Sequence, residues 1–482
     1  MTPQTFWAPD LPDFSGGAAG LVYDMDGALP GPRGFLPFKS YAEVSEALAA
    51  TCLGAVAAVT SDGTLAVFAG TATHLYRLDL TDFSWDDVSG TTYSATTEAP
   101  WGFTVFGEYV IAVNRNDAPQ HFQVGTDSAF SDVDSNAPAG GKVGVWGDQV
   151  VIGDQTDNPS RVSWSDINDH TEWQTGSSGA QVFPDGGRVV GFTDSDRGLV
   201  IQERAIRRYN YTGDYRIFQF AKVADNSGSR YPASVISRDQ FVFWLGEDGF
   251  YLGSLSSGIV SIGHNKINRW FLDTFSVVGN VIAAIDPAYS RVYWAAGSTT
   301  PNVFDTLLIY DWRLEQWAKA SVNLTSLFSY QTPGVTLEGL DAIYPNLDTM
   351  PISLDSRQLQ GGALIVGGFG SANMLGGFSG ENAAARFVSA EMQPSAGRSG
   401  RARRVRPIVD VADNLNVTVT AQTRKRRAGA WATRQARTTN SRGWAKTNSS
   451  GAFHRFQTDI AAASDWVNYQ GLEIDFAQEG KG

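Results

Sequence analysis

The chain has 482 residues, of which 42% are hydrophobic and 18% charged, so it can bury a large core and is not disordered by composition. Its formal net charge of −13 argues against nucleic-acid binding by the whole surface, because phosphate contacts require lysine and arginine. A single cysteine, Cys52, excludes an intrachain disulfide and a zinc site built from cysteines.

The first 54 residues are expected to be extended, because Pro30-Gly31-Pro32 and Pro37 would interrupt any helix there. Within this segment, residues 40–50 predict one short helix with Ser40 as its N-cap. The segment has neither the charged part nor the apolar part of a signal peptide. No apolar run in the chain approaches the length of a membrane span, so we expect no membrane partner.

From residue 55 to residue 369 the sequence repeats a unit of roughly 40–50 residues, each a set of short apolar runs separated by Gly, Asp and Asn. In the first unit, Asp62-Gly63 between two apolar runs is a strong hairpin signal. The next run ends in Tyr76…Asp79, and Trp85 follows shortly after. A similar order recurs in Tyr310-Asp311…Trp317.

This repeat predicts a β-propeller of six or seven blades. One four-stranded blade cannot bury both of its faces, whereas radial stacking buries them and leaves only short edges. The abundant tryptophans are then expected to pack mainly between blades. A series of β-sandwiches or a β-solenoid is the alternative architecture.

Residues 370–482 differ in character from the repeat. The glycine-rich stretch 367–380 predicts a linker, and strict alternation in Val417–Thr420 and Leu472–Phe476 predicts half-buried strands. We therefore predict an all-β chain in three parts. They are residues 1–54, which join a platform or close the propeller; residues 55–369, the propeller; and residues 370–482, an antiparallel β platform.

Basic residues gather in this last part of the chain. Between Arg398 and Arg455, fourteen basic residues stand against two acidic ones, which gives about +12 and leaves about −25 for the rest. Such asymmetry indicates a distinct face or partner. The candidate interface or DNA-proximal residues are Arg401, Arg403, Arg404, Arg406, Arg424, Lys425, Arg426 and Arg427.

The sequence lacks the spacing of common catalytic and metal sites. Its five histidines are far apart, and it contains neither a Gly-x-Ser-x-Gly elbow nor a P-loop. Most of the candidate carboxylates stand in Asp-Gly or Gly-Asp turns, where the carboxylate caps its own backbone. These candidates are Asp62, Asp79, Asp148, Asp154, Asp166, Asp185, Asp248 and Asp286. A calcium site at Asp154…Asp157 is a minor alternative. We therefore predict no enzyme, no catalytic residue, no metal ligand and no cofactor. The competing hypothesis is a propeller glycoside hydrolase or carbohydrate-binding protein, which would use paired carboxylates or stacking tryptophans.

Three ordered stretches resemble one known family. Residues 161–173 read RVSWSDINDHTEW, where a run ends in a tryptophan and an Asp-rich turn leads to another. Residues 185–213 continue the pattern, and residues 403–476 contain Arg403–Asp410, Ser450–Phe456 and Gly471–Phe476. In this order the stretches resemble the tail nozzle (tail tube, tail hub) proteins of short-tailed bacteriophages, the podoviruses. The sequence resemblance covers residues 140–220 and 400–476. Over the rest of the chain, only the architecture is similar.

The resemblance implies a structural protein of the virion tail that is assembled in the host cytoplasm. It implies a homo-oligomer, expected to be a hexamer, below the portal and its head-to-tail adaptor ring. Such a ring conducts DNA during ejection, carries tail fibres or spikes, and encloses genomic double-stranded DNA only transiently in its lumen. Because a conduit should not grip phosphate, we expect a neutral or acidic lumen, with the arginines mainly in subunit interfaces.

Overall fold

The structure is a computed structural model, and it describes residues 2–13, 20–60, 63–213, 217–256, 258–275, 280–298, 303–332, 340, 346, 361–394, 399–411 and 417–478. Strands dominate these residues, and the short helix α1 (Asn268–Thr274) and the 3-10 helix η1 (Pro232–Ser234) lie between them. The predicted all-β class is therefore confirmed. Within the described ranges, no helix is both long and apolar enough to cross a membrane.

Five separate antiparallel sheets of four strands follow one another through the described part of the chain, each built from consecutive hairpins. The first contains β6 (Gly54–Val59), β7 (Leu65–Gly70), β8 (Leu75–Leu78) and β9 (Trp85–Asp87), and the second β10 (Gly102–Phe106), β11 (Tyr109–Val113), β12 (Gln120–Gln123) and β13 (Ser131–Asp132). The third contains β14 (Gly140–Trp146), β15 (Gln149–Gln155), β16 (Arg161–Trp164) and β17 (Gly179–Val182). The fourth contains β18 (Val189–Phe192), β19 (Arg197–Gln202), β20 (Ala205–Tyr211) and β21 (Phe218–Asp225), and the fifth β22 (Ile236–Arg238), β23 (Phe241–Leu245), β24 (Phe250–Ser254) and β25 (Gly258–Ser261).

Two further four-strand sets belong to a larger sheet and share one long strand. The first set is β26 (Val281–Ile285), β27 (Arg291–Ala296), β28 (Phe304–Asp311) and β29 (Gln316–Gln331). The second set begins with the same β29 and continues through β30 (Leu364–Gly370) and β31 (Met374–Asn382) to β5 (Lys39–Ala47). A strand from near the N-terminus thus completes a set whose other strands lie about 300 positions later in the chain. We call strands β5–β31 the repeat region.

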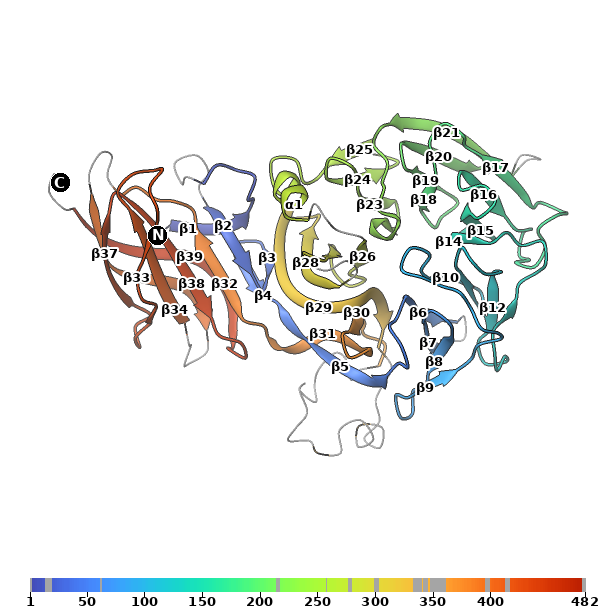
Figure 1. The fold of residues 1–482 in the computed structure, drawn as a ribbon, viewed down its shortest axis with the longest axis horizontal. Coiled ribbons are helices and arrows are strands. Elements are labelled where there is room, and N and C mark those ends of the chain that lie inside the picture. Colours follow the sequence, from blue (N-terminus) through green and yellow to red (C-terminus); the bar gives the residue numbers. More distant parts are fainter. Residues whose placement is uncertain are drawn as a thin grey trace.

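Neighbouring sets touch one another mainly through their first strands. β6 contacts β10, β10 contacts β14, β14 contacts β18, and β18 contacts η1, which leads into β22. β22 contacts β26, β26 contacts β29, and β29 contacts β6 again. Figure 1 shows these sets grouped around a common centre, in colours that run from blue through green and yellow to the orange of β30 and β31.

Tryptophans fill the junctions between neighbouring sets. Trp146 on β14 is fully buried and stacks on Tyr209 of the fourth sheet, with 3.9 Å between the ring centroids. Its indole N–H donates to the carbonyl of Thr193 at 2.9 Å. In the same way Trp101 donates to the carbonyl of Thr71 at 2.8 Å, across the first and second sheets. Each ring buries a large apolar area and still satisfies its one polar group.

Residues 40–50, predicted to be a helix, do not form one, and residues 40–47 belong to strand β5 instead. Ala42 and Val44 are buried, and β5 pairs with β31. An isolated helix of this length is marginal in water, and pairing with a sheet edge that would otherwise be open outweighs the local preference.

The glycine-rich stretch 367–380, predicted to be a linker, forms β30 and β31. A Cβ added to Gly368 would lie 2.1 Å from the carbonyl oxygen of Ser326, and one added to Gly376 would lie 2.3 Å from that of Ala42. The glycines therefore allow close approach of neighbouring strands rather than flexibility. Through β31 the strands of the repeat region continue to Asn382.

The remaining strands form a two-layered unit that we call the platform, which lies beside the repeat region (Figure 1). One layer runs β37 (Ala445–Gly451), β33 (Gly400–Val411), β39 (Trp466–Gln478), β4 (Gly34–Pro37) and β3 (Ala28–Gly31). The other runs β1 (Thr2–Trp7), β2 (Gly20–Asp26), β32 (Ala385–Ser389), β38 (Phe453–Ile460) and β34 (Val417–Arg424), with the short strands β35 (Ala432–Thr433) and β36 (Arg437–Thr438) at its edge. Val405, Val419 and Phe456 belong to one buried cluster between the layers. Strands β1–β4 are thus part of the platform, although the C-terminal part of the chain supplies most of its strands.

Candidate functional site

Four of the predicted basic residues lie on strand β33 of the platform. Ala402 and Val405 of this strand face the core, whereas Arg401, Arg403 and Arg404 are exposed. Lys446, also exposed, lies opposite Arg404 on the neighbouring strand β37. The outer surface of this layer is therefore lined with cationic side chains.

Acidic and aromatic neighbours hold two of these arginines in place. The Nε atom of Arg404 lies 3.0 Å from Oδ2 of Asp475, and Arg406 forms an ion pair with Glu473. Both guanidinium groups lie over the ring of Trp444, at 4.4 and 5.1 Å from its centroid. Because these ion pairs are exposed, they add little to folding stability and leave the face available to a partner.

The basic run that begins at Arg424 divides into a buried and an exposed part. Arg424 donates from Nη2 and Nε to the carboxylate of Glu391, at 2.6 and 3.1 Å, and Glu391 is only 1% exposed. Lys425, Arg426 and Arg427 are exposed in the turn after β34. Arg424 thus helps to hold the platform together, whereas the three residues after it lie on its surface.

A stack of aromatic and guanidinium groups supports the same end of the platform. The ring of Trp431 lies 4.4 Å from the guanidinium of Arg424 and 4.6 Å from that of Arg455. Arg455 forms an ion pair with Asp13. Neither Glu391 nor Asp13 lies near its arginine in the chain, so the sequence alone does not indicate these two pairs.

Two aspartates of the repeat region, Asp79 and Asp286, hold turns, although neither stands next to a glycine in the sequence. Oδ1 of Asp79 accepts the backbone N–H of Thr81 at 2.7 Å. Oδ1 of Asp286 accepts those of Ala288 and Tyr289 at 2.9 and 3.0 Å. In the described part of the chain, no three His, Cys, Asp or Glu side chains gather as metal ligands would.

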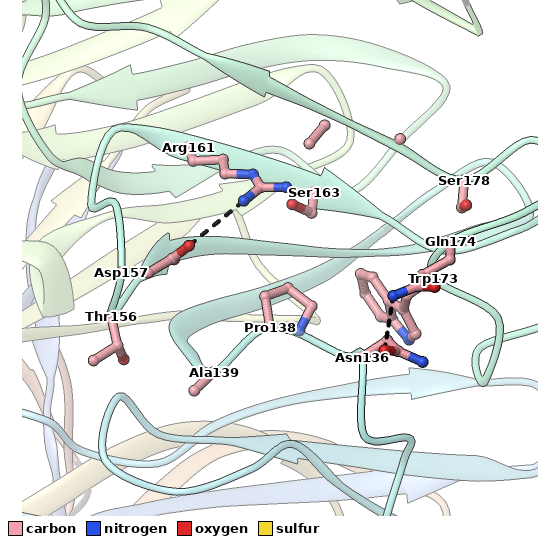
Figure 2. A pocket seen from close by; sticks show the side chains of 12 residues that line it. Asn136, Pro138, Ala139, Thr156, Asp157, Arg161, Ser163, Trp173, Gln174 and Ser178 are labelled. Atoms are coloured by element: carbon pink, nitrogen blue, oxygen red, sulfur yellow. Dashed lines mark hydrogen bonds and ion pairs between the residues drawn. The ribbon is translucent and has the colours of Figure 1, made fainter.

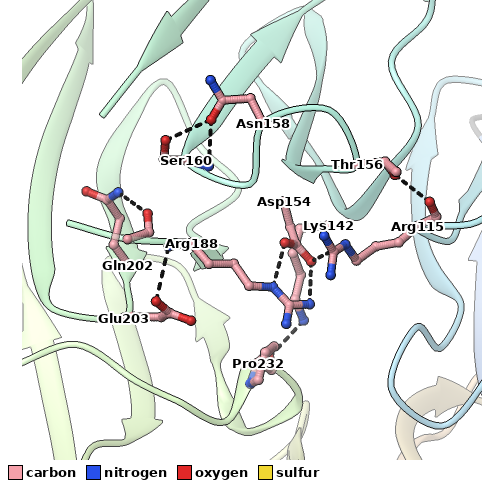
Figure 3. Close-up of polar contacts among 11 residues, drawn as sticks. Arg115, Lys142, Asp154, Thr156, Asn158, Ser160, Arg188, Gln202, Glu203 and Pro232 are labelled. Carbon is pink, nitrogen blue, oxygen red and sulfur yellow. Dashed lines mark hydrogen bonds and ion pairs between the residues drawn. The ribbon is translucent and has the colours of Figure 1, made fainter. Parts of the chain in front are cut away.

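Asp154 is different, because it is completely buried and lies among cations (Figure 3). Arg188, just before β18, donates from Nε and Nη2 to the two carboxylate oxygens at 2.5 and 2.6 Å. Nε of Arg115, which follows β11, lies 3.6 Å from Oδ2. The minor hypothesis of calcium at Asp154…Asp157 is therefore not supported, since two guanidinium groups occupy the surroundings of Asp154.

Lys142 on β14 completes this cluster. Its Nζ donates to the carbonyl of Pro232 at 2.8 Å, so the cluster joins the second, third and fourth sheets to η1. Burial, opposed by Asp154 and reinforced by Arg188, lowers the pKa of Lys142 to about 8. Burial also raises the pKa of Asp154, although Arg188 and Arg115 oppose it. No sequence signal brings these four residues together, because Lys142 and Asp154 share the β14–β15 hairpin whereas Arg115 and Arg188 come from neighbouring sheets.

A pocket of about 550 Å³ lies between the second and third sheets (Figure 2). Trp173, Pro138 and Ala180 supply apolar lining, and polar groups surround them. The side-chain amide of Gln174 donates to Asn136 at 2.7 Å, and Arg161 lies 3.5 Å from Asp157. The polar residues that line the pocket are Asn136, Thr156, Asp157, Arg161, Ser163, Gln174 and Ser178. This combination of one aromatic ring with amides, hydroxyls and a single carboxylate suits a polar, hydroxylated ligand.

No protein-family model matches the chain, and no curated protein matches its sequence. Among solved structures, the chain is similar to the computationally designed Ika8 protein, with a TM-score of 0.38 and 10% identity over 72% of this chain and 97% of that one. It is also similar to a protein from Bacteroides fragilis assigned as a 6-phosphogluconolactonase, with a TM-score of 0.36 and 13% identity over 58% and 80% of the two chains. A third is the extracellular domain of a protein from B. thetaiotaomicron assigned as a hybrid two component system, with a TM-score of 0.39 and 10% identity over 84% and 47%. At these scores the similarities carry no argument about fold or function.

Proposed function

We propose that the repeat region is a seven-bladed β-propeller. The five four-stranded sheets and the two sets that share β29 support this number of blades. The series of contacts that leads from β6 through β26 and β29 back to β6 supports a closed ring. In this proposal β5 is the outer strand of the last blade, so a strand from one end of the chain joins the two ends of the propeller.

We further propose that the chain is a structural, non-enzymatic subunit of the tail nozzle of a short-tailed bacteriophage. The observation that carries this proposal is the exposed basic face of the platform, formed by Arg401, Arg403 and Lys446 on an otherwise acidic chain. In a ring of identical subunits, one face of each copy contacts a different face of the next. A basic face and an acidic remainder are complementary in this way.

In this function six copies form a ring below the head-to-tail adaptor. Platform arginines lie mainly in subunit interfaces, the repeat region offers surface to tail fibres or spikes, and a neutral or acidic lumen conducts double-stranded DNA without holding it. The ring assembles in the host cytoplasm and becomes part of the virion tail. The order of sequence stretches that resembles the podovirus nozzle family supports the same assignment.

Charge reversal on the platform tests this function. The double variant Arg401→Glu/Lys446→Glu changes two exposed side chains of the outer layer and leaves its core intact. By mass photometry, the wild-type chain should form particles of about six copies, and the variant should remain as single copies. A control variant, Arg230→Glu/Arg269→Glu, reverses two cations of the repeat region that are 67% and 84% exposed and should assemble as the wild type does. Normal assembly of the platform variant would contradict the proposed interface.

The pocket of Figure 2 favours a second candidate, a carbohydrate-binding protein. The ring of Trp173 can pack against a sugar, and the amides of Asn136 and Gln174 can hydrogen-bond to its hydroxyl groups. Hydrolysis would need a pair of carboxylates, whereas Asp157 is the one acidic residue in this lining and is paired with Arg161. A glycan array probed with the wild-type chain and Trp173→Ala would test binding, with Trp444→Ala as the matched control on the platform.

A further inference from the structure

The cluster around Asp154 holds more positive than negative charge. Three cations, Arg115, Lys142 and Arg188, surround one buried carboxylate. A second carboxylate, that of Glu203, lies at the edge and accepts the backbone N–H of Arg188 at 3.4 Å (Figure 3). Cations that are withdrawn from water in excess of nearby anions are costly unless an anion compensates them.

Asp154 cannot compensate all three cations, because it carries at most one negative charge. Each of its two oxygens accepts one hydrogen bond from Arg188. Nε of Arg115 is buried and has no hydrogen-bond partner among the described residues, since its distance of 3.6 Å from Asp154 is too long. The described partner of the Lys142 ammonium is the neutral carbonyl of Pro232. Hydrogen-bond donors of Arg115 and Lys142 are therefore available to a further, anionic acceptor.

The cluster is also open to a ligand on one side. The side chains of Arg115 and Arg188 are each 26% exposed, and Figure 3 shows them converging on Asp154 from different sheets. Gly141 lies beside them, and a Cβ there would lie 2.6 Å from Oδ2 of Asp154 and 2.9 Å from Cγ of Arg115, closer than van der Waals contact allows. The absence of a side chain at this position therefore lets Asp154 and Arg115 pack against the backbone. A small ligand can reach the donors from the side on which the two arginines are exposed.

We propose that Arg115, Arg188 and Lys142 form a binding site for a small oxyanion, where the second, third and fourth sheets meet. Guanidinium groups present several N–H donors in a plane that matches the oxygens of a phosphate or a carboxylate, and the ammonium adds a point charge. The ligand oxygens accept from Arg115 and from the N–H groups that Arg188 does not use for Asp154. The site lies in the repeat region and does not depend on the proposed assembly through the platform.

The test is a titration of the purified full-length chain with inorganic phosphate, with acetate and with chloride at constant ionic strength, followed by thermal unfolding and calorimetry. We expect a saturable rise in Tm with phosphate or acetate but not with chloride, because a ligand that binds only the folded state stabilises it. Phosphate alone would indicate a phosphoryl ligand, and acetate alone or both would indicate a carboxylate ligand.

Two variants locate the binding. Arg115→Gln removes one cation and leaves the Asp154–Arg188 pair intact, so the affinity should fall by about tenfold or more, the effect of one lost charge-assisted hydrogen bond. Lys142→Met removes the ammonium and should have a similar effect, which keeps the test valid if Arg115→Gln does not fold. Arg269→Gln, on the exposed surface of α1, should bind as the wild type does. The proposal is overturned if neither anion gives a saturable shift, or if Arg115→Gln and Lys142→Met bind with unchanged affinity, which would indicate an adventitious ion only.

Discussion

The repeat region and the platform are both antiparallel β structures, but they are assembled from different distances along the chain. Each separate sheet of the repeat region consists of consecutive hairpins. In the platform, strands from the two ends of the chain pair with each other, as at Thr2↔Leu472 and Tyr469↔Phe35. The platform therefore cannot be completed before the end of the chain is available, whereas each separate sheet can form from local contacts.

The two regions also use charge differently. In the repeat region, Asp154 and its cations connect neighbouring sheets, and aspartates such as Asp79 hold turns. In the platform, Arg424 is buried against Glu391, but the cations of β33 and β37 point outward. Charge thus serves cohesion between sheets in the first region and, in our proposal, contact between subunits in the second.

The largest expected effect comes from the aromatic junctions of the repeat region. Trp146→Ala removes a fully buried ring and its hydrogen bond to Thr193, so the free energy of unfolding should fall by about 4 kcal/mol. Trp444→Ala, on the outer face of the platform, loses mainly its stacking with Arg404 and should cost about 1 kcal/mol or less. Urea denaturation followed by circular dichroism measures both. Equal losses in the free energy of unfolding would contradict the expected difference between Trp146 of the repeat region and Trp444 of the platform.

The second effect divides the basic run of the platform. Arg424→Ala leaves the carboxylate of Glu391 buried without its ion pair and should destabilise the chain by about 3 kcal/mol. Arg426→Ala, two positions later and exposed, should change stability by less than about 0.5 kcal/mol. The same denaturation experiment compares them. A negligible effect of Arg424→Ala would show that this arginine belongs with the surface residues.

A third effect concerns pH at the junction of the second and third sheets. His170 is 7% exposed, and its Nε2 lies 2.7 Å from Nδ1 of His121. Burial and the neighbouring His121 lower the pKa of His170 to about 4, so the folded protein favours the neutral ring. The stability that goes with the neutral His170 ring is fully present above the usual pKa of 6.5 and is lost as the pH falls toward 4. Near pH 4.5 the free energy of unfolding should be lower by about 2 kcal/mol. His170→Gln should reduce the pH dependence of Tm over this range. An unchanged slope would contradict a buried neutral His170.

The smallest effect tests whether aspartates of the repeat region act through their turns. Asp79→Ala removes the acceptor for the N–H of Thr81 and should cost about 1 kcal/mol. Asp79→Asn keeps an oxygen acceptor and should recover most of that loss. If Asn were as destabilising as Ala, the charge rather than the turn would be the important property of this residue.

The sequence was informative where structure is local. Apolar runs separated by turn residues predicted strands that the structure contains, among them β7, β11 and β38. Alternation in Val417–Thr420 likewise corresponds to β34, in which Val417 and Val419 are buried. These signals depend only on which face of a strand meets the core.

Long-range pairing explains most of what the sequence did not reveal. Residues 40–47 form a strand because β31 offers an edge about 330 positions away. The glycines of β30 and β31 are needed for close strand contacts that a single sequence does not indicate. The sequence predicts eight basic residues as candidates for an interface. It does not indicate that Arg424, unlike Lys425, is paired with Glu391. The sequence did not indicate the Asp154 cluster, because its members come together only where three sheets meet.

Electron microscopy of the purified full-length chain, with and without adaptor rings from a short-tailed phage, tests the nozzle assignment most directly. We expect closed rings of about six subunits that attach to the adaptor, with the exposed residues of β33 and β37 at contacts between neighbouring copies. Chains that remain single at all concentrations and do not attach to adaptor rings would contradict it.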